Sequence, residues 1–126
     1  MTNMNQSDLL GKALTIDLTS GSISTRPLEP AFARAYLGGR GYTSRLQYDL
    51  LPKTVDPLGP ENILIFAPGA LTGTPTLSSS RIVVGGRSPL TGILGDANSG
   101  GFFGPTLRRA GWGLTLIYGK APHPVY

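Results

Sequence analysis

Alternation of apolar and polar residues near the start of the chain predicts a pair of strands. Leu14, Ile16 and Leu18 occupy every second position within residues 12–18, which gives a strand one apolar side. The stretch Thr-Ser-Gly-Ser that follows is typical of a turn, so residues 23–26 can return as the second arm of a hairpin. We therefore expect the chain to open with two antiparallel strands.

The hydrophobic spacing then becomes helical. A glutamate–proline pair suits the start of a helix and a glycine pair suits its end, so residues 30–37 are predicted to be helical. Tyr42, Leu46 and Leu50 recur at four-residue spacing within residues 41–51, which predicts a second helix.

The second half of the sequence predicts short strands, one helix and a long loop. The apolar run at 63–67 is typical of a strand buried on both faces, and the Gly, Pro, Thr and Ser residues at 68–80 are typical of a loop. Further strands are predicted at 81–84, 92–94 and 114–118, with a turn at 88–91 and a helix at 102–110.

This mixture favours an α+β fold: a twisted, mostly antiparallel β-sheet with two or three short helices. Residues 1–10 are polar and are predicted to be a disordered tail, and residues 11–126 are expected to form one domain. The apolar, strand-like character of the chain near residue 126 leads us to expect that further polypeptide, or a partner, continues the sheet.

Charge and cysteine content narrow the ligand classes. The formal net charge of +4 suits a phosphorylated ligand, and the basic residues are scattered, so we expect no nucleic-acid partner; a basic nucleic-acid module is the weaker alternative. The chain has no cysteine, so it cannot itself hold a cysteine-bound iron–sulfur cluster. It lacks a signal peptide and the run of ~20 apolar residues that a membrane span needs, which predicts a cytoplasmic protein without a membrane partner.

Candidate chemistry concentrates in two places. The stretch Ala-Asn-Ser-Gly-Gly-Phe at 97–102 is predicted to join a strand to a helix, where free backbone N–H groups and glycines can bind an anion. The alternative is that Asn98 or Ser99 only caps the helix. Arg81 can pair with a phosphate or a planar ring, or can be a solvated residue at a strand end. No catalytic residue is predicted, since the carboxylates show no paired spacing and His123 is the single histidine.

Seven phrases in a fixed order resemble one family. They read LTIDLTSG (14–21), YLGGRG (36–41), VDPLGPEN (55–62), PGALTGT (68–74), RSPLTG (87–92), ANSGGFFG (97–104) and GKAPHPVY (119–126). Each phrase is weak alone, but together they resemble the N-terminal domain of the tungsten- or molybdenum-dependent aldehyde:ferredoxin oxidoreductases. The resemblance runs from about residue 11 to the last residue.

The resemblance implies a pterin-binding platform. In the family this domain is a β-rich base beneath a tungsten or molybdenum atom held by two pterins. Arg81 and the segment Asn98, Ser99, Gly100 and Gly101 match cofactor-binding positions, and the backbone carbonyl of Asn98 matches a ligand of a magnesium ion between the pterin phosphates. Two serines precede Arg81 where the family often has glycines, which affects how closely the backbone can approach the cofactor.

The resemblance also implies that the complete enzyme needs polypeptide beyond this region. In the family, the 4Fe-4S cluster, the catalytic residues and a second pterin-binding segment follow this region, so residues 11–126 are expected to be a partial domain. The expected activity is oxidation of aldehydes to carboxylic acids with ferredoxin as electron acceptor, and this part is incomplete as a catalyst alone. The alternative is a stand-alone scaffold or interaction subunit, possible as a homo-oligomer, that completes its sheet with a second chain.

Overall fold

The computed structural model describes residues 11–126, so the predicted disordered tail at 1–10 lies outside the described residues. Six strands and three helices form this part of the chain: β1 Lys12–Asp17, β2 Ser22–Pro27, α2 Pro30–Tyr36, α3 Arg40–Leu50, β3 Ile63–Pro68, β4 Ile82–Arg87, β5 Leu94–Ser99, α4 Phe103–Arg109 and β6 Trp112–Tyr118.

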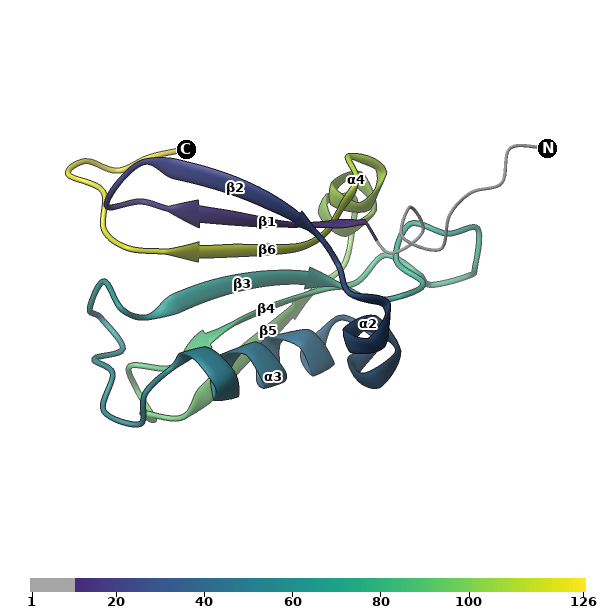
Figure 1. Cartoon of the computed structure of the whole chain (residues 1–126). Helices are drawn as coiled ribbons and strands as arrows, with labels where there is room; N and C mark the ends of the chain where they lie inside the picture. The colour runs from purple at the N-terminus through teal and green to yellow at the C-terminus, as the bar shows by residue number, and fades with distance from the viewer. Residues whose placement is uncertain (1–10) are drawn as a thin grey trace.

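The strands form a single sheet in the order β2-β1-β6-β3-β4-β5. β1 and β6 pair in parallel, and the other neighbouring strands of the described chain pair antiparallel. Figure 1 shows the strand direction turning progressively from β2 to β5, as expected from the intrinsic twist of strands. The predicted α+β fold with a mostly antiparallel sheet is confirmed.

Helices α2 and α3 cover one face of the sheet. α2 begins with Pro30, whose fixed φ suits a first helical turn, and its C-cap is Leu37, which adopts a left-handed conformation with φ 59°. Figure 1 shows both helices lying against this face. The principal core is buried between them and the sheet. Its buried apolar residues are Ala13, Leu28, Ala33, Tyr42, Leu46, Ile63, Ile65, Ala67, Leu114 and Leu116.

The opposite face of the sheet is largely uncovered. α4 lies over one end of it, where Phe103 packs on Phe66 with ring centroids 5.9 Å apart. Leu64 remains 43% exposed, so the prediction that this strand is buried on both faces was wrong: no helix covers its second side. Strand register assigns a set of apolar residues to this uncovered side, here called the open face: Leu14, Ile16, Ile23, Leu64, Val84, Ala97 and Ile117.

The structure corrects the sequence prediction around residues 92–102. The strand expected at 92–94 overlaps β5 only at Leu94, and β5 continues to Ser99. Asn98 and Ser99 therefore lie in a strand instead of the turn before a helix, and neither caps α4, whose N-cap is Phe102 without a side-chain hydrogen bond. Pairing with β4 holds the Asn-Ser segment extended despite its turn-like composition.

None of the helices formed by residues 11–126 is both long and apolar enough to cross a membrane.

Candidate functional site

The register of β4 and β5 brings the two predicted binding segments together. Ile82 pairs with Ser99 and Val83 pairs with Asn98, so Arg81 and Gly100 lie just beyond the last pair at the same end of the sheet. These two segments are separated in sequence by the turn that joins β4 to β5. The site is therefore assembled by strand pairing.

Strand alternation divides these residues between the two sides of the sheet. Val83 faces the α3 side, since its Cγ2 lies 3.4 Å from where a Cβ on Gly39 would sit. Asn98 shares that side because it pairs directly with Val83, whereas Ser99 points to the other side with Ile82. Continuing the alternation by one residue assigns Arg81 to the side of Asn98, so Ser99 contributes its backbone to this site and its side chain elsewhere.

Arg81 offers a free guanidinium group. Its side chain is exposed and makes no hydrogen bond or ion pair with the part of the chain that the structure describes. Its backbone carbonyl is fixed, because it accepts a 2.7 Å hydrogen bond from the Thr72 hydroxyl. The same hydroxyl oxygen accepts a 2.9 Å bond from the backbone N–H of Gly69, so Thr72 ties the long loop to the base of the arginine.

Gly100 and Gly101 leave their backbone open to a ligand. No atom lies within 4 Å of where a Cβ on Gly101 would sit, and the nearest atom to a Cβ on Gly100 would be the Ser80 hydroxyl oxygen at 3.8 Å. Gly101 has φ +91°, which a residue with a side chain would adopt only under strain. A bulky ligand can thus reach these peptide groups.

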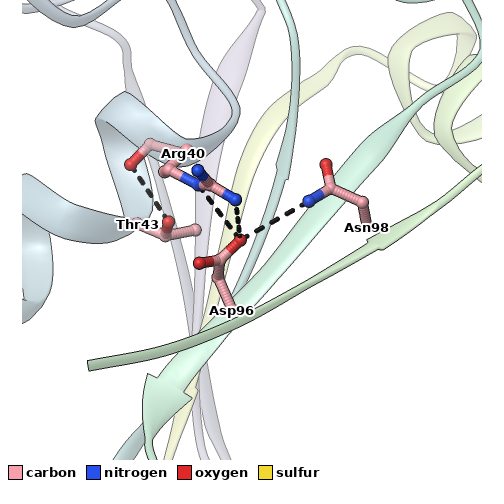
Figure 2. A network of polar contacts seen from close by, with 4 residues as sticks. All are labelled: Arg40, Thr43, Asp96 and Asn98. Atoms are coloured by element: carbon pink, nitrogen blue, oxygen red, sulfur yellow. Dashed lines mark hydrogen bonds and ion pairs between the residues drawn. The ribbon is translucent and has the colours of Figure 1, made fainter. Parts of the chain in front are cut away.

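A polar network beside Asn98 joins the helix layer to the edge strand (Figure 2). The guanidinium of Arg40 donates to Oδ2 of Asp96 from Nε at 3.1 Å and from a terminal nitrogen at 2.9 Å. The side-chain amide of Asn98 donates to the same oxygen at 3.4 Å. Sequence reasoning missed Arg40 and Asp96; Arg40 stands in a quoted family phrase, but no local signal links two residues so far apart in the chain.

The network also supplies a charge that α3 lacks. Arg40 is the first residue of this helix, its N-cap Gly39 makes no side-chain hydrogen bond, and the first turn holds no acidic residue. Asp96, from β5, brings a negative charge to this end of the helix, where the helix dipole favours an anion.

The predicted site is a surface and not an enclosed pocket. Arg81, Asn98 and Gly100 are exposed, and none of them lines the hollows of about 490, 1050 and 220 Å³ found among the described residues. No group of three His, Cys, Asp or Glu side chains able to hold a metal occurs among residues 11–126. The arrangement offers a guanidinium group and peptide N–H groups to an anionic ligand from one side.

Comparison with protein families identifies one match that spans nearly the whole chain. Residues 13–126 match the family model described as the aldehyde ferredoxin oxidoreductase N-terminal domain.

Curated relatives and one solved structure agree with this match. The chain is 47% identical over 116 residues to a tungsten-containing aldehyde ferredoxin oxidoreductase of Pyrococcus abyssi and 34% identical over 120 residues to the WOR-like subunit of an aliphatic sulfonate oxidoreductase of Pyrococcus furiosus. Each alignment covers 92% of this chain and 19% of the relative, so the chain spans about a fifth of their length. The active-site complex BamBC of benzoyl coenzyme A reductase, in complex with 1,5-dienoyl-CoA, contains a chain similar to this one, with a TM-score of 0.90 and 40% identity over 93% of this chain and 18% of that chain.

Proposed function

The chain belongs to the aldehyde ferredoxin oxidoreductase family and corresponds to its N-terminal domain, and from this premise we propose that it binds one side of a metal–pterin cofactor. The observation that carries the proposal is the meeting of an exposed, unpaired Arg81 with the open backbone of Gly100 and Gly101 across the β4–β5 pair. Guanidinium and peptide N–H groups are donors suited to phosphate oxygens.

The residues at this end of the sheet fit such a group. β5 is the last strand in the sheet order, so part of its backbone is available to a ligand. Arg81, Asn98, Ser99, Gly100 and Gly101 would hold the pterin, and the backbone carbonyl of Asn98 would help bind magnesium between the phosphates. When bound, the tungsten or molybdenum would supply the redox chemistry that turns an aldehyde into a carboxylic acid.

The proposal assigns the rest of the catalyst to other polypeptide. Relatives are about five times as long, so the 4Fe-4S cluster, the acid–base residues and the contact with ferredoxin are proposed to lie outside residues 11–126. The one-sided surface supports this division, because a large cofactor resting on it needs a second wall. Ferredoxin as acceptor and a cytoplasmic location belong to the same proposal.

Substitution of the two side chains that face the proposed cofactor tests this function. In the holoprotein that contains this chain, Arg81→Ala and Asn98→Ala are expected to lower the pterin and the tungsten or molybdenum bound per chain, because each removes a polar contact. Metal analysis and pterin fluorescence after oxidation measure both quantities. Arg26→Ala, an exposed arginine of β2, is the matched control. Unchanged cofactor content in both site variants would contradict the proposal.

A second function is favoured by the open face. A sheet side that exposes apolar residues such as Leu64 and Ile23 suits a scaffold subunit that packs its sheet on a second chain, including a second copy. Size-exclusion chromatography tests this alternative. A monomer at every concentration, with no co-purifying partner, would argue against it.

A further inference from the structure

Arg40, Asp96 and Asn98, on the α3 side of the sheet, indicate how one side chain of the proposed site is oriented. We propose that Arg40 and Asp96 form a positioning pair that turns the side chain of Asn98, so that its oxygen and not its nitrogen faces the cofactor. This inference rests on the proposed function and adds to it a direction for one contact and two residues outside the predicted set.

The contacts converge on a single atom. Oδ2 of Asp96 accepts two N–H groups of Arg40, at 2.9 and 3.1 Å, and the amide nitrogen of Asn98 at 3.4 Å. The Asp96 side chain is only 16% exposed, while that of Arg40 is 66% exposed. The carboxylate is thus held between a helix and an edge strand, and the arginine fixes it by charge-assisted hydrogen bonds.

The carboxylate of Asp96 determines which atom of the Asn98 side-chain amide faces it. An ionised carboxylate only accepts hydrogen bonds, so the amide NH₂ of Asn98 must face Asp96. The reversed amide would set two acceptor oxygens against each other. The contact of 3.4 Å is long and weak as a bond, yet it still selects the direction. Figure 2 shows the result: the Asn98 nitrogen points to Asp96 and its oxygen points away.

The orientation has a consequence for what Asn98 can bind. An outward amide oxygen accepts hydrogen bonds from N–H groups, such as those of a pterin ring, or coordinates a cation. It cannot donate to a phosphate oxygen. The phosphate contacts of the proposed site therefore fall to Arg81 and to the peptide N–H groups of Gly100 and Gly101, and Asn98 recognises the ring or the cation.

Removal of the carboxylate is the first test. In the holoprotein, Asp96→Ala frees the Asn98 amide to rotate, and retention of pterin and metal during dialysis is expected to weaken by about tenfold, a typical effect of losing an outer partner. The matched control is Asp49→Ala, which breaks the Arg45–Asp49 ion pair on the exposed side of α3, the helix that carries Arg40. Equal retention in the two variants overturns the proposal.

Exchange of the two charges separates positioning from simple stabilisation. Arg40→Asp combined with Asp96→Arg restores an ion pair, and an aspartate suits the first turn of α3. An arginine at position 96 only donates hydrogen bonds, so it would draw the Asn98 oxygen inward. We expect the double variant to regain more of the melting temperature than of the cofactor lost in Asp96→Ala. Recovery of both in equal measure means that the pair is merely structural and overturns the proposal.

Arg81→Ala, measured beside these variants, distinguishes failure of the proposed cofactor site from failure of the positioning pair alone. Loss of cofactor in Arg81→Ala together with full retention in Asp96→Ala would leave the proposed function standing and remove the positioning pair. Full retention in Arg81→Ala, Asn98→Ala and Asp96→Ala alike would remove both.

Discussion

At the scale of single residues, Tyr42 links the core to the pH dependence of stability. Its ring is buried and packs against the ring of Phe32 in a tilted arrangement, with centroids 4.8 Å apart. Burial raises the pKa of Tyr42 above its ordinary value of 10.0, and the charge of Arg108 opposes this rise. Burial likewise lowers the pKa of Arg108 from its usual range. Both groups therefore disfavour their charged forms in the folded state.

The raised pKa of Tyr42 predicts a loss of stability in alkali. Above about pH 10 the unfolded chain ionises this tyrosine while the folded chain does not, so the free energy of unfolding falls as pH rises from there toward the folded pKa. Tyr42→Phe is expected to reduce the fall in melting temperature between about pH 9 and pH 11. Tyr48→Phe, at an exposed position of the same helix, is the control. An equal slope in both variants would contradict the assignment to Tyr42.

At the scale of elements, α3 packs closely against β4 at Gly85. A Cβ on Gly85 would lie 2.6 Å from Cβ of Thr43 and 3.0 Å from Nε2 of Gln47. The helix is therefore packed against the strand more closely than a side chain at position 85 would allow. Because α3 lies close to the sheet, Arg40 at the start of this helix is within reach of Asp96 on β5.

Two glycine-to-alanine substitutions distinguish a glycine needed for helix–sheet packing from one needed for ligand access to the backbone. Gly85→Ala is expected to lower the free energy of unfolding by about 1–3 kcal/mol, because it overpacks the helix–sheet contact. Gly100→Ala meets only an ordinary contact, so its stability should stay within about 0.5 kcal/mol of the parent while cofactor content falls. Urea unfolding measures the first quantity and metal analysis the second. A Gly100→Ala protein with full cofactor would show that the open backbone is not used.

The elements were predictable where local pattern and tertiary packing agree. The hairpin of β1 and β2 and the start of α2 at Pro30 follow from alternation and turn chemistry, and the structure confirms them. β5 was misplaced because Asn98 and Ser99 have turn propensity, and only their pairing with Val83 and Ile82 holds them extended. The contact of Arg40 with Asp96 depends on tertiary structure, so no sequence spacing could indicate it.

At the scale of the whole molecule, the uncovered side of the sheet is the largest departure from a self-contained domain. Sequence alternation predicted one apolar side for the strand at residues 12–18, but it could not show that helices would cover one face of the sheet and leave most of the other open. The open face and the one-sided surface proposed to bind the cofactor both suit packing against further polypeptide or a partner.

A lysine on the open face tests whether that face packs against another chain. Leu64→Lys is expected to change the free energy of unfolding by no more than about 0.5 kcal/mol, because Leu64 is partly exposed, yet to weaken association with the chain or segment that covers it. Leu90→Lys, at an exposed leucine of the turn before β5, is the control. Light scattering and size-exclusion chromatography measure assembly, and equal assembly in both variants would count against an interface here.

The position of β6 between β1 and β3 determines when the sheet can assemble during synthesis of the chain. Among the six strands of residues 11–126, β6 is the last to leave the ribosome, and it lies between β1 and β3 in the sheet. Until it emerges, the nascent chain holds the β1–β2 hairpin and the β3–β4–β5 meander as two unjoined pieces with bare edges. Translation must therefore pass Tyr118 before the sheet can close, and a stop codon before Trp112 would leave both pieces as substrates for chaperones and proteases.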